Sequence, residues 1–259
     1  MQSTPGFWHV LPMTKLVGHG LIVLFLTMVT QIGGLAWLVS RLFRRSLLAF
    51  VIVYAAFSFA AQYTAPVFGR TPLSCFGSGN LQVQSWFYCA LNRTYVSPAL
   101  LEVLQDNADA VAREYPGTVT LVLDGNFPFW DGFPLLPHLS HDDGEKADLA
   151  FFYSEDGRYV PGAVRSPIGY FAFESGPTEC RKSWLSLRWD LGWAQGIWRD
   201  LLFEEGRTFF LVKVLAEDAR VQKVFIEPHL KDRMGADFRK IRFQGCRAAR
   251  HDDHIHVQL

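Results

Sequence analysis

The sequence has no excess of either charge and few cysteines. Its 259 residues include 25 lysines and arginines and 25 aspartates and glutamates, so the formal net charge is zero. Nucleic-acid-binding domains normally carry a basic excess, and we therefore expect no nucleic-acid partner. The four cysteines form no Cys-x-x-Cys pair, which argues against a structural zinc ribbon. No internal repeat or low-complexity segment is visible.

Charged residues are also missing from two long stretches near the N-terminus. The first covers residues 16–40, between Lys15 and Arg41, and the second covers residues 46–69. A bilayer-spanning helix needs about 20 apolar residues, so we predict two transmembrane helices at about 16–40 and 47–69. A cleaved signal peptide fits poorly, because the first run is too long and starts too late. A buried helical pair in a soluble core is the alternative, but neither run has a polar stripe.

The segment between the two runs is rich in arginine. It reads Arg41-Leu42-Phe43-Arg44-Arg45, and positively charged loops remain in the cytoplasm. We therefore predict a membrane anchor over residues 1–70, with the loop cytoplasmic and both termini outside. Residues 71–259 are predicted to form an extracytoplasmic domain. The protein is expected to be a two-pass protein of a bacterial inner membrane, with the lipid bilayer as a partner and the domain in the periplasm.

All four cysteines, Cys75, Cys89, Cys180 and Cys246, lie beyond the membrane segment. In an oxidising compartment they can form two disulfides, with three possible connectivities. We favour Cys75–Cys89, which closes a short loop, and Cys180–Cys246, which ties a mid-domain loop to the approach of the last strand.

The remainder of the chain mixes helical and strand patterns. Apolar spacing predicts a helix from Ser97-Pro98 to about Tyr115 and another over residues 207–219. Short apolar or β-branched runs predict strands at 118–123, 148–153, 222–226, 241–243 and 253–258. The fold class is therefore α+β, a small antiparallel sheet with flanking helices. Four tryptophans between Trp184 and Trp198 are either core residues or the floor of a groove.

Five of the eight histidines lie in two clusters. The first reads His138-Leu139-Ser140-His141-Asp142-Asp143-Gly144-Glu145-Lys146-Ala147-Asp148, and the second reads His251-Asp252-Asp253-His254-Ile255-His256. Alternate residues of a strand share a face, so His254 and His256 point the same way. Gly144 suits a turn that folds His141 toward Asp148. Two imidazoles and a carboxylate suit Zn²⁺ and leave one position for water, as catalytic zinc sites do.

Each cluster also has a plain interpretation. A lone His138 is most often a solvated loop residue, residues 142–146 can be a charged surface turn, and a His-x-His pair can arise by chance. The occurrence of both clusters in one domain favours the metal site. In the second cluster His251 is out of phase with His254 in a regular strand, so we expect a bend at Asp252-Asp253, and either aspartate can orient a histidine.

The two clusters resemble a known family of enzymes. The first resembles His-x-Ser-His-x-x-Gly-x-x-x-Asp and the second resembles His-x-x-His-x-His, the motifs of the LAS group of zinc peptidases, which includes D-Ala-D-Ala peptidases and lysostaphin-like enzymes. The match is closest to the penicillin-insensitive murein endopeptidases. Residues 221–231, VQKVFIEPHLK, also resemble a strand-Pro-helix stretch of that family. The resemblance covers roughly residues 97–259.

The resemblance implies a LAS/hedgehog-type peptidase fold with one Zn²⁺ per chain and peptidoglycan peptide as the substrate. It implies His141, Asp148 and His256 as the zinc ligands. His251 and His254 are implied as the catalytic pair that acts on the water and on the developing oxyanion. His138 is a further candidate beside the ligands or for substrate contact, together with Asp252 and Asp253.

Two other functions fit the same residues. A zinc-binding domain without activity would act as a wall-interaction module. A zinc amidohydrolase or peptidase would act on a substrate other than murein. The segment before His138 is aromatic and rich in proline, unlike the Gly- or Arg-containing loop of the resembled enzymes, and this departure bears on substrate specificity. The choice between His251 and His254 as the proton-transfer residue also stays open.

Overall fold

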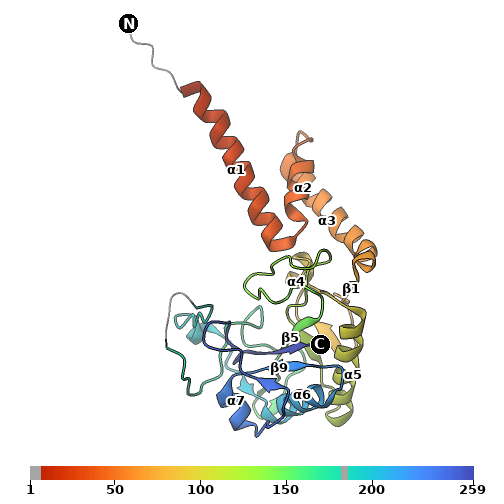
Figure 1. The fold of residues 1–259 in the computed structure, drawn as a ribbon, viewed down its shortest axis with the longest axis vertical. Helices are drawn as coiled ribbons and strands as arrows, with labels where there is room; N and C mark the ends of the chain where they lie inside the picture. The colour runs from red at the N-terminus through yellow and green to blue at the C-terminus, as the bar shows by residue number, and fades with distance from the viewer. Residues whose placement is uncertain (1–6, 182–185) are drawn as a thin grey trace. The chain divides into compact units, whose positions relative to one another are not determined.

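The structure is a computed structural model that describes residues 7–181 and 186–259 (Figure 1). The chain forms two compact units, an N-terminal unit of residues 1–64 and a C-terminal unit of residues 65–259. Each unit is described by itself.

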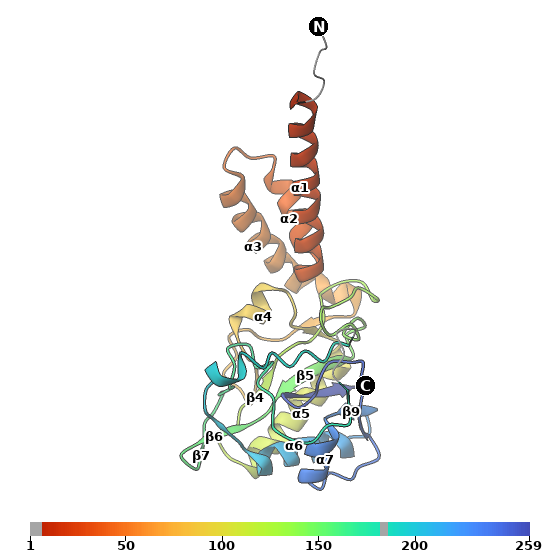
Figure 2. The ribbon, with the colours of Figure 1, turned by 90° about the vertical axis from the view of Figure 1, so that its left-hand side faces the viewer.

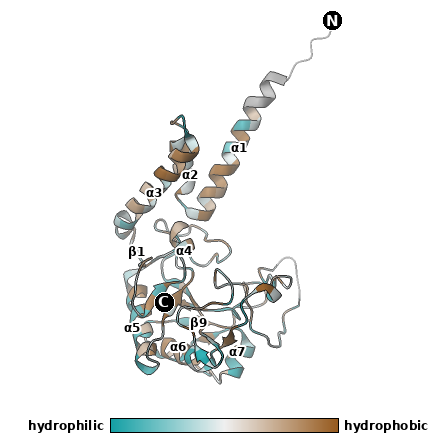
Figure 3. Ribbon diagram, turned by 180° about the vertical axis from the view of Figure 1, so that it is seen from behind, coloured by the Kyte–Doolittle hydropathy of each residue, from teal (hydrophilic) through white to brown (hydrophobic). Residues whose placement is uncertain are grey.

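From residue 7 onward, the N-terminal unit consists of the helices α1 (Phe7–Thr30), α2 (Gly33–Ser40) and α3 (Ser46–Thr64). Within the described residues, two stretches are long and apolar enough to cross a membrane, Met13–Thr30 and Ser46–Phe68. The second continues into the 3-10 helix η1 (Ala65–Phe68). Only 6% of each stretch is buried, which disfavours a soluble helical core. Figure 3 shows hydrophobic residues along all three helices.

A turn interrupts the first predicted span. α1 ends before Gln31, which has a φ of 65°, and the N–H of Gly33 donates to Thr30 Oγ1 at 2.9 Å. A Cβ atom added to Gly34 would lie 2.0 Å from Thr27 Oγ1, so glycine permits the close approach of α2 to α1. The prediction of one continuous helix over residues 16–40 is therefore wrong.

α2 runs antiparallel to both of its neighbours (Figure 2). The indole N–H of Trp37 donates to His19 Nδ1 of α1 at 3.3 Å. The Trp37 ring centroid also lies 5.6 Å from that of Phe50 of α3. The 41–45 turn thus lies toward the N-terminal end of α1, and α1 and α3 run in the same direction.

The C-terminal unit is an α+β structure with small sheets. Its elements are β1 (Thr71–Pro72), β2 (Leu81–Val83), α4 (Trp86–Ala90), β3 (Tyr95–Val96), α5 (Pro98–Glu114), β4 (Thr120–Val122), β5 (Lys146–Ala150), β6 (Tyr153–Glu155), β7 (Arg158–Tyr159), η2 (Gln195–Ile197), β8 (Leu202–Phe203), α6 (Glu205–Glu217), β9 (Lys223–Phe225), α7 (Pro228–Arg233), β10 (Ile241–Arg242) and β11 (His254–Gln258). Ser97 caps α5 by accepting the N–H of Leu100, with Pro98 at the first helical position, as the Ser-Pro pair predicts.

Among the described residues, the main sheet has six strands in the order β10-β9-β11-β5-β4-β2, with smaller sheets β1-β3 and β7-β6-β8. The central strands β9, β11, β5 and β4 pair antiparallel, as predicted. The outer pairs, β10 with β9 and β2 with β4, are parallel. The main sheet is therefore mixed, because α7 and α5 connect these outer pairs and a helical crossover returns the chain in the same direction.

One face of the sheet packs against α5 and α6. The core on this face combines alternate strand residues with the apolar sides of both helices, and it includes Ala147, Leu149, Ile255, Val257, Leu104 and Leu215. Since a one-residue slip would turn every side chain to the other face, this core fixes the strand register. The opposite face is left for polar side chains and for the loops that cover them.

The cysteine prediction is confirmed. Cys75 is bonded to Cys89 and Cys180 to Cys246, so all four cysteines of the sequence are paired. Disulfides persist in oxidising compartments, and they indicate an extracytoplasmic C-terminal unit.

Candidate metal centre

Strands β5 and β11 bring the two histidine clusters together. His256 lies directly opposite Asp148 in the antiparallel register, and His254 lies opposite Ala150. Residues two apart in a strand share a face, so the two imidazoles and the Asp148 carboxylate point to the same side of the sheet. All three side chains are buried. The prediction that the two clusters meet in space is confirmed.

His141 reaches the same point from the loop before β5. Its Nδ1–H donates to the Gly125 carbonyl at 2.7 Å, which leaves the Nε2 lone pair facing Asp148. Gly144 has a φ of +85°, and its N–H donates to the Asn126 side chain at 3.0 Å. The turn predicted between His141 and Asp148 is therefore present.

The three predicted ligand atoms form a small triangle. His141 Nε2 lies 3.1 Å from His256 Nδ1 and 3.3 Å from Asp148 Oδ1. His256 Nδ1 lies 2.9 Å from Asp148 Oδ1. With zinc bonds of about 2.0–2.1 Å, two ligand atoms at a tetrahedral angle are about 3.4 Å apart. Small adjustments therefore allow one ion to contact all three atoms.

His138 supplies a further donor close to the predicted ligands. The side chains of His138, His141 and Asp148 offer ligand atoms that all lie within 4.8 Å of one another, so this group can hold a metal ion. His138 Nδ1 lies 2.8 Å from Asp148 Oδ2 and 3.2 Å from Asp124 Oδ2. It thus faces the carboxylate oxygen opposite the one that His256 approaches.

The donor set fits zinc, and His254 shows an open position beside it. His254 Nδ1 lies 2.5 Å from Asp253 Oδ1, so Nδ1 carries the hydrogen and Nε2 the lone pair. The buried Nε2 has no hydrogen-bond partner among the described residues and lies 3.7 Å from Asp148 Oδ1. An unpartnered buried nitrogen is costly, and a water at the fourth position of a zinc ion would satisfy it.

The surrounding charges shift the pKa values of Asp148 and His254 in opposite directions. Burial alone would raise the pKa of Asp148, but the facing imidazoles bring it well below its ordinary value. Burial lowers the pKa of His254, whereas the carboxylates of Asp148 and Asp253 raise it, and the result lies above the ordinary value. The site thus holds an ionised carboxylate beside a basic imidazole.

His251 joins the site through the predicted bend. The chain bends at residues 252–253 before β11 begins, and the His251 ring centroid lies 4.8 Å from that of His254 and 5.7 Å from that of His256. Burial lowers the pKa of His251, and the two neighbouring imidazoles lower it further, well below its ordinary value. His251 is therefore a neutral imidazole at neutral pH.

The two aspartates of the bend have different partners. Asp253 holds His254 through one oxygen and accepts the Phe171 N–H through the other, at 2.6 Å. Asp252 instead pairs with Arg250 at 2.9 Å. Among the described residues, Asp253 is thus the candidate that hydrogen-bonds a histidine side chain, whereas Asp252 binds an arginine.

Tyr170, Asp124 and Arg93 also belong to the site, although no sequence pattern pointed to them. The Tyr170 hydroxyl lies 2.7 Å from Asp148 Oδ2 and 3.1 Å from Asp124 Oδ2. Burial would raise the pKa of Asp124, but Arg93 and His138 lower it to about 2. Arg93 donates to both Asp124 oxygens, at 2.6 and 2.7 Å. These contacts fix the orientation of the Asp148 carboxylate, with its Oδ1 atom in the ligand triangle.

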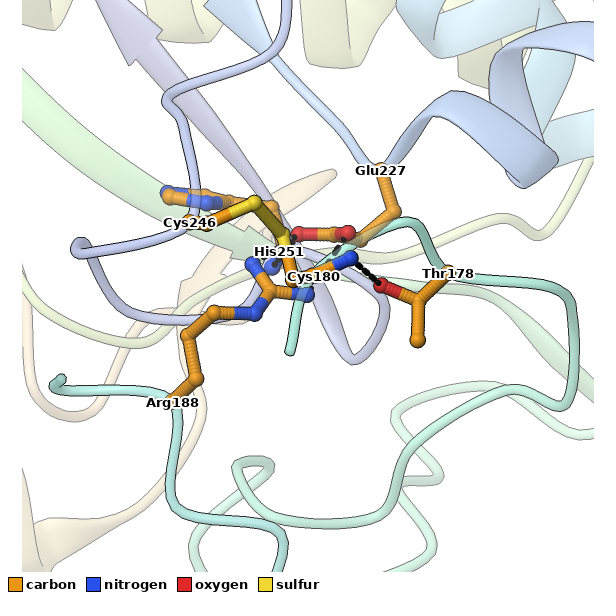
Figure 4. Close-up of a disulfide and its surroundings, with 6 residues drawn as sticks. All are labelled: Thr178, Cys180, Arg188, Glu227, Cys246 and His251. Carbon is orange, nitrogen blue, oxygen red and sulfur yellow. Dashed lines mark hydrogen bonds and ion pairs between the residues drawn. A yellow bond between two sulfur atoms is a disulfide. The ribbon is translucent and has the colours of Figure 1, made fainter. Parts of the chain in front are cut away.

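A disulfide and an ion pair lie beside His251 (Figure 4). Arg188 donates to both oxygens of Glu227 at 2.9 Å, and Glu227 Oε1 accepts the His251 backbone N–H at 3.3 Å. The Cys180–Cys246 disulfide joins the same two parts of the chain. The backbone of His251 is therefore anchored to the loop that carries Arg188.

Two cavities adjoin the site. The first, which we call the aromatic cavity, has a volume of about 180 Å³ and includes His138, Asp253 and His254 in its wall. The second has a volume of about 240 Å³ and includes His251 and His256. The first cavity thus adjoins His254, and the second adjoins His256 of the ligand triangle.

The chain matches no protein-family model, and none of the curated proteins compared with it is similar. The resemblance to LAS peptidases therefore rests on the motif residues alone.

Proposed function

We propose that the C-terminal unit is a zinc-dependent peptidase that hydrolyses peptide bonds outside the cytoplasm. The observation that carries this proposal is the pairing of the triangle of His141, Asp148 and His256 with the unpartnered Nε2 of His254. The three ligand residues alone could equally well bind a metal ion with a purely structural role. A buried, carboxylate-supported imidazole that faces the open position is what hydrolysis requires.

A zinc ion bound in the triangle would polarise the scissile carbonyl and lower the pKa of a coordinated water to about 7. His254 accepts the proton of the attacking water at Nε2, because Asp253 fixes the hydrogen on Nδ1. It then gives this proton to the leaving amine as the C–N bond breaks. The raised pKa of His254 makes Nε2 a better base. We therefore assign the proton-accepting role to His254.

His251 has a different role in this proposal. Its lowered pKa keeps it neutral, so it can donate one N–H to the carbonyl oxygen as negative charge develops there. Tyr170 and His138 contact Asp148 Oδ2 and keep the carboxylate in its orientation during the reaction.

The substrate that the resemblance implies is the peptide of peptidoglycan. A peptide or amide outside murein is the second candidate. The aromatic wall of the cavity beside His254 favours it, because ring surfaces suit a large apolar side chain.

The test uses the full-length protein in nanodiscs, loaded with zinc, and both muropeptides and a mixed peptide library. We expect cleavage that a chelator abolishes and that added zinc restores. The His254→Ala variant should retain zinc and lose cleavage. Retention of zinc by a wild-type protein that cleaves neither substrate would instead identify a non-catalytic zinc-binding module.

We also propose that the positively charged end of the N-terminal unit lies in the cytoplasm. Lys15, Arg41, Arg44 and Arg45 are the lysines and arginines of residues 1–64. Arg41 follows Trp37 by about one helical turn, and Lys15 precedes His19 by about one turn, so the Trp37–His19 contact puts them at the same level. Positive residues favour the cytoplasmic side.

The N-terminal end of α1 is then cytoplasmic, and α3 leads outward to the C-terminal unit. α2 returns the chain from the turn at Gln31 toward the cytoplasmic side. It covers about 12 Å at 1.5 Å per residue, less than the about 30 Å of a hydrocarbon core, so it does not span the core as a helix by itself. The expectation that both termini lie outside rested on a continuous helix over residues 16–40, and the turn at Gln31 removes that basis. A bacterial inner membrane with the C-terminal unit in the periplasm is the location that we propose.

A further inference from the structure

The aromatic cavity opens directly beside His254. Its wall contains six aromatic side chains, Phe87, Tyr88, Tyr170, Phe171, Phe173 and Trp189. The two phenol groups are engaged elsewhere, since Tyr88 donates to the Ile168 carbonyl and Tyr170 contacts Asp148. The cavity therefore presents mainly ring surfaces.

Each charged side chain in the wall is already paired. Arg93 and Asp124 form a two-pronged ion pair. Arg250 donates to Asp252 and stacks 3.9 Å above the Phe173 ring centroid. A charged group of a ligand would lose its hydration here without gaining a free partner.

Phe171 is held in an uncommon backbone conformation at the cavity wall. Its φ is 63°, a region that non-glycine residues rarely adopt and that is enriched at ligand-binding sites. The Phe171 N–H donates to Asp253 at 2.6 Å, and its carbonyl accepts from Trp198 at 2.8 Å and Gln195 at 2.7 Å. The Asp253 carboxylate thus supports the His254 ring and also holds the backbone of Phe171 in the cavity wall.

The volume of the aromatic cavity indicates how large a side chain would fill it. A cavity of about 150 Å³ lined by apolar side chains binds benzene, and this one measures about 180 Å³. A methyl group, which is all that D-alanine offers, would leave most of the volume empty. A benzyl or branched aliphatic side chain would fill it.

We propose that the aromatic cavity is a specificity pocket for a large, uncharged apolar side chain of the residue that adjoins the scissile bond. This inference rests on the proposed function, because the bond must lie near His254. The second cavity, on the side of His251 and His256, receives the chain on the other side of the bond. The substrate is then an extended peptide that passes across the site and is cut internally.

A binding experiment tests the pocket without catalysis. Full-length protein in nanodiscs, loaded with zinc, is titrated with N-acetylated amides of phenylalanine, leucine, alanine and lysine, followed by saturation-transfer NMR with empty nanodiscs subtracted. We expect the phenylalanine and leucine amides to bind at least about tenfold more tightly than the alanine amide. Equal binding of the alanine amide, or preference for the lysine amide, overturns the proposal.

Matched tryptophan variants locate the binding. Trp189 lines the cavity and is 50% exposed, whereas Trp193 is 79% exposed and lies outside the wall. Trp189→Ala should reduce the ratio of phenylalanine to alanine binding at least threefold, and Trp193→Ala should leave the ratio as in the wild type. An unchanged ratio in Trp189→Ala would place the binding elsewhere and contradict the proposal.

A charge introduced at the mouth of the cavity should reverse the selectivity. Phe87 lines the cavity at 39% exposure, and its neighbour Trp86 is 73% exposed and outside the wall. Phe87→Glu should favour the lysine amide over the leucine amide relative to the wild type, and Trp86→Glu should not. The absence of any shift in Phe87→Glu counts against the pocket.

Cleavage separates this inference from the proposed function. Peptides that vary at the two positions flanking one bond should show at least about tenfold higher kcat/KM for phenylalanine or leucine than for alanine at one of them. Cleavage that prefers alanine overturns the pocket and leaves the peptidase standing. Selective binding of the phenylalanine amide without any cleavage overturns the peptidase and leaves the pocket standing.

Discussion

At the scale of single residues, the role that we propose for each histidine depends on the group that hydrogen-bonds its imidazole ring. His141 is fixed by a backbone carbonyl and His254 by the Asp253 carboxylate, so both rings have a defined tautomer. His138 faces two carboxylates, which together raise its pKa to about 10 although burial lowers it. His138 Nδ1 approaches Asp148 Oδ2, whereas His256 Nδ1 lies 2.9 Å from Oδ1 within the ligand triangle, and this geometry favours His256 over His138 as the third ligand.

The ligand assignment predicts different zinc contents for three variants. His141→Ala and His256→Ala should each lose most of the zinc, measured as metal per chain after dialysis. His138→Ala should retain it, because its ring contacts the oxygen of Asp148 that faces away from the ligand triangle. Loss of zinc in His138→Ala with retention in His256→Ala would replace His256 by His138 in the ligand set.

Replacing Asp253 should lower kcat, although Asp253 does not contact the proposed metal ligands directly. Asp253→Asn weakens the support of the His254 ring, and residues that orient a site histidine in this way are worth about 10- to 100-fold. We expect kcat to fall by that factor with zinc content unchanged. Asp252→Asn is the comparison, since Asp252 pairs with Arg250, and its kcat should stay within about threefold. Equal losses in both variants would refute the role of Asp253.

At the scale of elements, Asp218 ends α6 and ties it to its surroundings. The Arg220 side chain lowers the pKa of Asp218 to about 2 by hydrogen bonding, from an ordinary value of 3.8. A depressed pKa stabilises the fold above pH 3.8, and this contribution is lost as the pH falls toward 2. Asp218→Asn should therefore lower the melting temperature at pH 7 and have a shrinking effect from pH 5 to pH 3.

The size of this effect is small because Arg220 is well exposed. Solvent screens such a pair, and we expect less than about 1 kcal/mol at neutral pH. Asp237→Asn, at an exposed ion pair with Lys231, serves as the control. A difference that grows as the pH falls would contradict the sign derived from the pKa.

The direction of α1 predicts that its N-terminal end lies in the cytoplasm. A reporter enzyme that is active only outside the cytoplasm should be inactive when fused before Met1 and active when fused after Leu259. The two-pass hairpin drawn from the sequence predicts activity at both positions, so the N-terminal fusion separates the two topologies. Replacing Arg41, Arg44 and Arg45 by serine should reduce the activity of the C-terminal fusion, because these charges set the orientation.

Local patterns predicted the helices α5 and α6 and the strands β4, β5, β9, β10 and β11 of the C-terminal unit, but not the short strands β1, β2, β3, β6, β7 and β8 or the helix α4. The Ser97-Pro98 start of α5 and the His-x-His strand are local signals, and both are present. The strand at 241–243 was predicted, but its parallel pairing with β9 was missed, and β2, which pairs parallel with β4, was not predicted. A helix lies between the strands of each pair, and that order implies a crossover. The break at Gln31 was hidden because an uninterrupted apolar run says nothing of where the chain turns.

The site could be predicted only in part for the same reason. His141, Asp148, His254 and His256 were found because short spacings tie them to a turn and two strands. Tyr170 lies in an irregular stretch, and nothing in its neighbourhood indicates that its hydroxyl meets Asp148. Loop residues that converge on a site by tertiary packing leave no periodic signal.

At the scale of the whole molecule, the metal centre joins distant parts of the chain. His256 and Asp148 are 108 residues apart and face each other across the middle of the sheet. Closing so long a loop costs entropy before any contact is gained. An ion held by both strands binds only the folded chain, so its binding free energy adds to the stability of the fold. If zinc occupies the site as we propose, removal of zinc outside the cytoplasm would destabilise the sheet and abolish the proposed activity at the same time.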